Sequence, residues 1–261
     1  MKIGAPGESD PNEQRVALVP ETVERLVKAG HEISIGEGAG TTAGFPNSAY
    51  TGVGATMGTA GDIAGSVDIF VHVQSPTPSE LSAMKKGTIV VGLLNARTDS
   101  AGVSALAAAG VTALSMELVP RIARAQRMDV LSSQASIAGY KAALLAANSL
   151  GKYLPMMMTA AGTIPPARVL VLGAGVAGLQ AIATARRLGA VVEAFDVRAA
   201  ALEQRWTARR RALHGKIRGR GYAVPPGFAA GRGAAVVEPA SAGLGLAGHS
   251  CGIVADGAST R

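Results

Sequence analysis

Residues 167–178 read Ala-Arg-Val-Leu-Val-Leu-Gly-Ala-Gly-Val-Ala-Gly, an apolar run that leads directly into three glycines with the spacing GxGxxG. The apolar part predicts a buried strand, and the alanine-rich residues 179–188 predict a helix. Residues 190–195 predict a second strand, and Asp196 follows it. The order strand, glycine turn, helix and strand predicts the first βαβ unit of a Rossmann-like nucleotide-binding domain.

Each glycine of this turn has an expected role toward a dinucleotide. Gly173 permits the tight turn, Gly175 lets a pyrophosphate approach the backbone, and Gly178 lets the helix lie against the sheet. Asp196 comes 23 residues after Gly173, close to the ~20-residue offset of the carboxylate that binds the adenosine ribose. A carboxylate there would repel a 2′-phosphate, so the motif favours NAD(H) over NADP(H). A glycine turn without a ligand is the alternative, which the complete βαβ context disfavours.

Upstream of the glycine turn, short apolar runs alternate with helical patterns. Strands are predicted at residues 2–5, 31–35, 68–73, 88–94 and 111–116, and helices at residues 20–29, 79–87, 99–109 and 133–150. Nearly continuous Val, Ile and Leu runs between helices favour a parallel sheet that is covered on both faces. Prolines at 155, 165 and 166 then interrupt the chain, and we place a domain boundary near residue 140. The sequence therefore predicts an α/β protein with two Rossmann-like domains and parallel sheets: residues 1–140, and an incomplete second domain at residues 141–204.

The positive charge of the chain lies in its last 57 residues. Residues 205–261 hold nine basic and two acidic side chains, so the total of 25 Lys and Arg against 18 Asp and Glu leaves residues 1–204 neutral. No uncharged apolar run approaches the ~18 residues of a membrane span, and no signal peptide is visible. A single cysteine excludes a disulfide framework and a multi-cysteine metal site. We expect a soluble, intracellular protein with no metal and no membrane insertion.

Polar side chains gather in residues 120–134, directly after a predicted strand, where Pro-Arg-Ile-Ala-Arg-Ala-Gln-Arg-Met-Asp-Val-Leu-Ser-Ser-Gln brings together three arginines, two glutamines, an aspartate and two serines. The carboxyl end of a strand is the usual place for site residues in open α/β sheets. A solvated loop whose Ser or Asp caps the next helix explains the same pattern. The spacing alone leaves both interpretations open.

Several blocks of this sequence resemble the NAD(H)-binding α subunit of proton-translocating NAD(P) transhydrogenase. They are Arg-Ala-Gln-x-Met-Asp-x-Leu-Ser-Ser at 124–133, Pro-Met-Met-Met-Thr-Ala-Ala-Gly-Thr at 155–163 and the stretch 165–180 around the glycine turn. Lys-Ile-Gly-Ala-Pro-x-Glu at 2–8 and Glu-Gln-Arg-Val-Ala-Leu at 13–18 resemble both that family and its relative, alanine dehydrogenase. The resemblance covers residues 1–204 and then stops.

The resemblance implies a homodimer of two-domain protomers that binds NADH in a cleft. It further implies that a partner subunit binds NADP(H) and that its NADP+ accepts the hydride, while a membrane-spanning subunit couples this transfer to proton movement. The implied location is cytoplasmic, peripheral to the inner or plasma membrane.

The resemblance also assigns roles to single residues. It places Arg121, Gln126, Asp129 and Ser132 around the nicotinamide as the catalytic positions, with Gln126 linking the two nucleotides. The other implied cofactor-binding residues are Arg127, Met128, Val176, Asp196, Val197 and Arg198, together with the three glycines. Hydride transfer between two nicotinamides needs no side-chain acid or base, so these residues position and polarise the cofactors.

Alanine dehydrogenase is the competing enzyme of the same family, and it is expected to need a Lys and a His for its amino or keto acid. Gln74 stands where that Lys would fall, and Leu94 stands near the His position. His72 lies on the same strand face as Gln74 and is an alternative base, although a strand histidine is more often structural. The absence of both groups favours the transhydrogenase.

The segment 205–261 departs from the pattern within the helix that follows Asp196. Three explanations compete: a shifted reading frame, which we favour, a real basic and disordered tail, and a nucleic-acid-binding segment, which we consider the least fitting. With half of the nucleotide domain missing, the chain would be an inactive, truncated NAD-binding fragment, with little or no binding of NADH itself. This is the alternative to a functional subunit.

Overall fold

The computed structural model describes residues 1–196 and the strand residues 212–213, 235–237 and 252–256. The chain forms two compact units, of which the first comprises Met1–Val130 and the second begins at Leu131.

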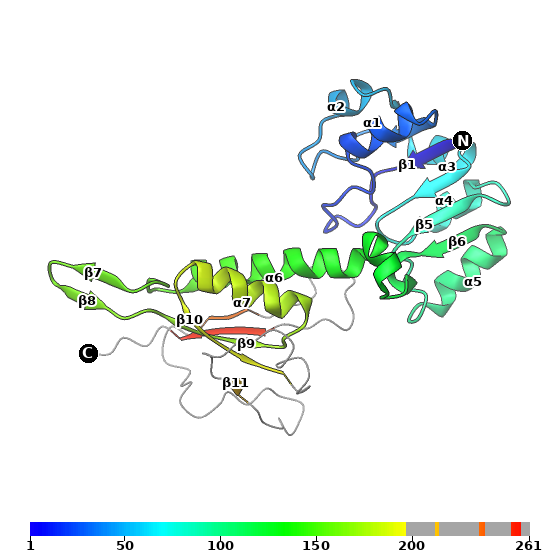
Figure 1. Cartoon of the computed structure of the whole chain (residues 1–261). Coiled ribbons are helices and arrows are strands. Elements are labelled where there is room, and N and C mark those ends of the chain that lie inside the picture. Colours follow the sequence, from blue (N-terminus) through cyan, green and yellow to red (C-terminus); the bar gives the residue numbers. More distant parts are fainter. Residues whose placement is uncertain (197–211, 214–234, 238–251, 257–261) are drawn as a thin grey trace. The chain divides into compact units, whose positions relative to one another are not determined.

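The first unit is built on a six-stranded sheet in the order β3-β2-β1-β4-β5-β6 (Figure 1). Its strands are β1 (Lys2–Ala5), β2 (Glu32–Gly36), β3 (Thr56–Gly58), β4 (Ile69–Val71), β5 (Ile89–Gly92) and β6 (Thr112–Ser115). All neighbouring strands pair in parallel. This is the doubly wound strand order, in which the chain reverses its direction of progress between β1 and β4. The parallel α/β sheet predicted from the sequence is confirmed.

Helices connect these strands, as parallel pairing requires. They are α1 (Pro20–Lys28), α2 (Asn47–Thr51), α3 (Ala60–Ser66), α4 (Pro78–Ala83) and α5 (Ser100–Ala109). Gly30 and Gly110, which follow α1 and α5, have φ angles of 87° and 68°. Glycine adopts this left-handed conformation without strain, so both residues end their helices as the sequence predicts.

The core of the first unit lies on both faces of the sheet, because successive strand residues point to opposite sides. On one face, Ile3 and Ala5 of β1 pack with Val23 of α1 and Tyr50 of α2. On the other face, aromatic and aliphatic side chains of β4, β5 and the helices α3 and α5 form a second cluster, which contains Ile63, Phe70, Val90 and Leu106. The strands are therefore covered on both sides, as their apolar sequences predict.

The second unit contains the glycine turn. Its helices are α6 (Val130–Ser149), whose first residue still belongs to the first unit, and α7 (Val176–Arg187). Its strands are β7 (Met157–Thr159), β8 (Gly162–Ile164), β9 (Arg168–Leu172), β10 (Val191–Phe195), β11 (Ala212–Leu213), β12 (Ala235–Val237) and β13 (Gly252–Asp256). The main sheet has the order β11-β10-β9-β13-β12.

Strand direction divides this second sheet into two parts. β9 and β10 pair in parallel, as the βαβ unit predicts, and β11, which was not predicted, pairs in parallel with β10. β13 pairs antiparallel with β9, and β12 pairs antiparallel with β13. β12 and β13 both come from the segment after residue 204, and the reversed direction of β13 makes this sheet mixed rather than wholly parallel. An antiparallel neighbour requires no crossover helix.

Helices α6 and α7 pack closely against each other in the second unit (Figure 1). A Cβ on Gly139 of α6 would overlap the backbone carbonyl of Ala177 in α7. Small residues of α6, among them Ala135, Ala142 and Ala146, are buried in the same cluster as Val169 of β9. The glycine and alanines of this helix thus serve the close packing that their sequence predicts.

Some elements were not predicted from the sequence. These are α2, β3 and α3 in the first unit, and the antiparallel hairpin β7–β8 in the second. All are short, and elements of three to seven residues give too little periodicity to be recognised. Helix α6 begins at Val130, three residues before its predicted start.

Candidate functional site

The glycine turn joins β9 to α7 in the second unit. Gly173 has a φ of 98°, and its N–H donates a hydrogen bond of 2.7 Å to the carbonyl of Phe195 in β10. A Cβ on Gly178 would overlap the carbonyl oxygen of Gly173, so the first turn of α7 lies directly against the glycine turn. These two glycines have the conformations and contacts that the fold itself requires.

Gly175 differs from its two neighbours in the motif. It has a φ of −74° and precedes α7 as its N-cap residue. A Cβ at Gly175 would meet no atom of the described residues within 4 Å. The packing of the described chain therefore does not require glycine here. Open space above the backbone, beside the N–H groups at the start of a helix, is the arrangement that an approaching phosphate needs.

Asp196 follows β10 and faces the same turn. Its side chain is buried, with 6% of the residue exposed. The carboxylate oxygen Oδ2 accepts a hydrogen bond of 2.8 Å from the backbone N–H of Ala174. A carboxylate has about four lone-pair positions, so it can hold the turn and also accept from a ribose hydroxyl. The structure thus brings together the turn and the acid that the sequence predicts to form one nucleotide site.

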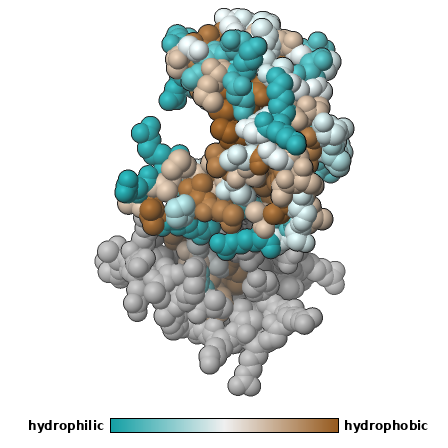
Figure 2. Space-filling view, turned by 90° about the vertical axis from the view of Figure 1, so that its right-hand side faces the viewer, coloured by the Kyte–Doolittle hydropathy of each residue, from teal (hydrophilic) through white to brown (hydrophobic). Residues whose placement is uncertain are grey.

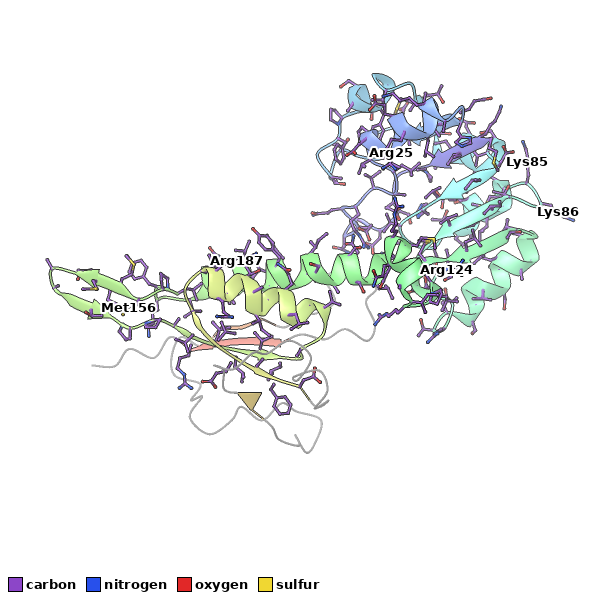
Figure 3. The ribbon with its side chains drawn as sticks, viewed as in Figure 1. Arg25, Lys85, Lys86, Arg124, Met156 and Arg187 are labelled. Atoms are coloured by element: carbon purple, nitrogen blue, oxygen red, sulfur yellow. The ribbon has the colours of Figure 1, made fainter. Side chains whose placement is uncertain are left out.

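The remaining residues expected near the cofactor in this unit are only partly described. Val176 is the first residue of α7, and 38% of it is exposed. Val197 and Arg198 lie outside the described residues. Basic residues occur at the opposite end of α7, where Arg187 lies in the last turn (Figure 3).

The polar stretch after β6 folds into two short 3-10 helices, η1 (Met116–Leu118) and η2 (Ala123–Met128). Ala125 of η2 is buried, whereas the other five residues of η2, including Arg124 (Figure 3), are exposed. Apolar side chains are exposed here too: Ile122 and Met128 are each 54% exposed. On the face shown in Figure 2, hydrophobic residues also reach the surface between hydrophilic ones.

The candidate residues of this stretch fall into both units. Arg121, Gln126, Arg127, Met128 and Asp129 belong to the first unit, and Ser132 belongs to the second. The first four are exposed, while Asp129 and Ser132 are half-buried. Asp129, which ends η2, and Ser132 in the first turn of α6 occupy positions that either a helix cap or a binding residue would take. Their role in binding stays a prediction.

Glu117 supports the chain just before this stretch, and sequence reasoning missed it. Its carboxylate accepts hydrogen bonds from the N–H groups of Leu94 and Ala96, at 3.2 and 2.9 Å, and from Ser115 Oγ at 2.5 Å. Burial opposes its ionisation, but the hydrogen bonds from Ser115 and Ala96 outweigh burial and lower its pKa. Glu117 therefore fixes the carboxyl ends of β5 and β6 to each other. The only sequence signal for this role of Glu117 was an acidic residue two positions after a strand.

A second polar network lies where the chain continues beyond β1 and β4. The Arg15 guanidinium donates to both oxygens of Glu13, from Nε at 2.8 Å and from Nη2 at 2.6 Å. Gln74 Nε2 donates to Glu13 Oε2 at 2.7 Å. Burial opposes the ionisation of Glu13, but the hydrogen bonds from Arg15 and Gln74 hold its pKa below the usual value. Gln74, expected at the Lys position of an alanine dehydrogenase, is thus bound to a carboxylate of the same chain.

His72 is buried and does not face solvent. Its side chain is 0% exposed, and its two ring nitrogens face the carboxylates of Glu8 and Glu80. A general base must reach the proton of its substrate. This placement supports the structural interpretation of His72 over the catalytic one.

The described residues contain no group of three or more His, Cys, Asp or Glu side chains arranged to hold a metal ion. Within the same residues, no helix combines the length and the apolar character needed to cross a membrane.

Two family models match this sequence. The model described as alanine dehydrogenase/PNT, N-terminal domain, matches residues 4–138, and the model for the C-terminal domain of the same family matches residues 142–216. The second match ends twelve residues beyond Gln204, where we expected the resemblance to stop.

Individual relatives agree with these models. A relative from Rhodospirillum rubrum, named as the first part of NAD(P) transhydrogenase subunit alpha, is 50% identical over 210 residues, which cover 78% of this chain and 55% of the relative. Alanine dehydrogenase of Mycobacterium tuberculosis is 31% identical over 208 residues, with 78% and 56% covered. The crystal structure of transhydrogenase from Sinorhizobium meliloti superimposes with a TM-score of 0.75 at 50% identity, covering 78% of this chain and 61% of that one. The chain therefore spans somewhat more than half the length of these relatives.

Proposed function

Because the chain belongs to the alanine dehydrogenase/PNT family, we propose that it is the NAD(H)-binding α subunit of a proton-translocating NAD(P) transhydrogenase. The observation that carries this proposal is the junction of the glycine turn with Asp196. There a buried carboxylate, the open backbone at Gly175 and the start of α7 lie within one βαβ unit.

The adenosine half of NAD(H) would be held by this junction. The N–H groups at the start of α7 would bind the pyrophosphate, because the first N–H groups of a helix have no partners inside it. Asp196 would accept hydrogen bonds from the ribose hydroxyls. Its negative charge would exclude the 2′-phosphate of NADP(H), because two anions in a buried site repel strongly.

The nicotinamide half would be positioned by the stretch after β6. Arg121, Gln126, Asp129 and Ser132 are the proposed residues, and their task is to orient the ring and polarise it. The cofactor itself supplies the hydride. To orient the nicotinamide ring, this stretch must be held rigidly against the sheet. Glu117 provides part of that support, because its hydrogen bonds join the ends of β5 and β6.

The hydride acceptor is proposed to be NADP+ bound to a partner subunit, with a membrane-spanning subunit coupling the transfer to proton movement. We also propose that the chain forms a homodimer and works in the cytoplasm, peripheral to the inner or plasma membrane. Support comes from the relative of 50% identity, whose name describes one portion of an alpha subunit of NAD(P) transhydrogenase.

Alanine dehydrogenase activity is the weaker candidate. Arg15, which shares Glu13 with Gln74, is bound by both oxygens of that carboxylate. Gln74 is itself bound to Glu13, and His72 is enclosed by carboxylates. The side chains of Arg15, Gln74 and His72 are turned toward carboxylates of the same chain, so they do not present the acid and base that oxidation of an amine requires.

Reconstitution tests the proposal. The 261-residue chain is combined with the NADP(H)-binding and membrane subunits of a transhydrogenase, and reduction of NADP+ by NADH is followed. We expect transfer that depends on this chain and falls at least tenfold in Gln126→Ala. Transfer that proceeds equally well without the chain, or NAD+ reduction driven by L-alanine, would contradict it.

A further inference from the structure

Three buried ionisable side chains meet at the point where the first sheet reverses its strand order. His72 follows β4, Glu8 lies in the connection after β1, and Glu80 belongs to α4. His72 Nδ1 lies 2.8 Å from Glu8 Oε2, and His72 Nε2 lies 3.7 Å from Glu80 Oε1. Their side chains are 0%, 3% and 7% exposed. We call these three residues the Glu8–His72–Glu80 triad.

Because a carboxylate lies near each ring nitrogen of His72, the geometry of the triad favours the protonated, positively charged imidazole. A neutral imidazole has one N–H, so one of its nitrogens would present a lone pair to a buried carboxylate. The imidazolium presents an N–H on both sides. At 2.8 and 3.7 Å from the ring nitrogens, both carboxylates lie close enough to attract a positively charged ring. Burial opposes the charge, but Glu8 and Glu80 outweigh it and raise the pKa of His72 from 6.5 to about 9.

The two carboxylates of the triad also hold the chain between β4 and α4. Glu8 accepts hydrogen bonds from the N–H groups of Val73, at 2.7 Å, and of Gln74, at 3.0 Å. Glu80 Oε2 accepts from the N–H and the hydroxyl of Thr77, at 2.7 and 2.8 Å. The residues bound by Glu8 and Glu80 are the two ends of the segment 73–77. His72 neutralises charge on both carboxylates that fix this segment.

Glu8 and Glu80 are the charged side chains of the described residues that act on His72. Phe70 of β4 stacks on it, with ring centroids 5.7 Å apart. On the β5 side, a Cβ at Gly92 would come within 2.7 Å of the His72 carbonyl, and glycine carries no charge. The triad therefore has two negative groups and one positive group, and its stability depends on the proton of His72.

We propose that the protonated His72 is a pH-sensitive electrostatic lock on the β4–α4 connection, and that loss of its proton releases segment 73–77. This lock is separate from the proposed nucleotide site of the second unit. Its effect extends along the chain, because Gln74 of the released segment also binds Glu13.

The sign of the pH dependence follows from the direction of the shift. A pKa that is higher in the folded state than in the unfolded state adds stability at low pH. The contribution of His72 is complete below its ordinary value of 6.5, and it is lost as the pH rises through about 9. The first unit should therefore weaken on the alkaline side of neutrality.

Histidine NMR of the full 261-residue chain tests the lock directly. The ring signals of His72 are assigned by their loss in His72→Gln and are followed from about pH 5 to about pH 10.5, a range that spans the ordinary and the raised pKa. We expect both ring nitrogens to carry protons near neutrality, with a midpoint near 9. In Glu80→Gln the midpoint should fall. A His72 midpoint at or below 6.5 would overturn the proposal, whether or not His72→Gln folds, since His72 can also be assigned through its backbone.

Unfolding measurements provide the second readout. Between about pH 6.5 and about pH 9.5 the unfolding equilibrium constant of the wild type should rise on the order of a hundredfold more than that of His72→Gln, which has no proton to lose. Amide hydrogen exchange at Val73 and Gln74 should rise over the same range. Equal pH dependence in both proteins would show that His72 does not act as a lock.

Discussion

The carboxylate of Asp196 accepts a 2.8 Å hydrogen bond from the backbone N–H of Ala174, which lies inside the glycine turn. This bond joins the end of β10 to the turn after β9. The two features are 22 residues apart in the sequence, and both belong to the proposed nucleotide site. The acid thus has a double role, because it fixes the turn and is proposed to bind the ribose.

Asp196→Asn separates these two roles. The amide oxygen can still accept from Ala174, so we expect a folded protein with an unfolding midpoint close to that of the wild type. Loss of the negative charge should weaken NADH binding about tenfold, because a hydrogen bond to a charged group is worth roughly 1.5–3 kcal/mol. It should also reduce the preference for NADH over NADPH. Calorimetric titration of both nucleotides checks this, and an unchanged NADH to NADPH ratio would speak against the assigned role.

Gly178→Ala should lower the stability of the second unit, whereas Gly175→Ala should lower the affinity for NADH. At Gly178 a Cβ overlaps the Gly173 carbonyl, so Gly178→Ala should destabilise the second unit by about 1–3 kcal/mol. At Gly175 a Cβ meets no described atom within 4 Å, so Gly175→Ala should unfold like the wild type and lose affinity for NADH. Thermal unfolding and NADH titration distinguish them. If Gly175→Ala lowers the unfolding temperature as much as Gly178→Ala does, the prediction that only Gly178 is needed for packing is wrong.

Gly139→Ala should destabilise the packing of α6 on α7. Its Cβ would overlap the backbone of Ala177, which cannot rotate away as a flexible side chain could. We expect a loss of about 1–3 kcal/mol. Gly151→Ala is the matched control, because a Cβ there meets nothing within 4 Å among the described residues. Chemical denaturation of both variants measures the difference, and a Gly139→Ala protein as stable as the control would contradict the packing described.

Glu117→Gln should lower stability in a pH-dependent way. The pKa of Glu117 lies below its ordinary value of 4.5, so its charge stabilises the fold above that pH and the benefit is lost as the pH falls through the folded value. We expect the variant to be about 1–3 kcal/mol less stable near neutrality, with the difference shrinking as the solution is acidified. Glu37→Gln, at an exposed position, serves as the control. A difference that is constant with pH would exclude the charge as its cause.

Gln74→Lys should not create an alanine dehydrogenase. The new ammonium group would face Glu13, which already binds Arg15 through both oxygens, and Leu94 would still occupy the position expected to hold a His. NAD+ reduction in the presence of L-alanine should stay at the background of the wild type. Alanine-dependent formation of NADH in this variant would show that Arg15 and His72 are more accessible to substrate than their contacts indicate.

Local sequence was enough to predict five of the six strands of the first sheet, the strands β9 and β10, and the longer helices. Apolar runs such as 168–172 and the glycine after α1 act within a few residues, so their pattern can be recognised without a structure. The same holds for the glycine turn, in which Gly173 and Gly178 have the conformation and contact expected of them.

The polar networks could not be predicted in this way. Glu8 binds Val73 and Gln74 across 65 and 66 residues, and Glu117 binds Leu94 across 23. Such partners are brought together by the strand order, which has no local signature. His72 illustrates the result: the sequence marks it as an alternative base, and only its burial between Glu8 and Glu80 reveals an ionic role.

Titration of the 261-residue chain with NADH and NADPH, in the wild type and in Gly175→Val, tests the central claim most directly. Calorimetry should show saturable binding of NADH that is at least tenfold tighter than binding of NADPH. Gly175→Val should abolish the NADH signal while its thermal unfolding stays that of the wild type. Absence of saturable NADH binding by the wild type would contradict the account and favour a fragment without nucleotide affinity. Undiminished binding by folded Gly175→Val would show that the glycine turn is not the site.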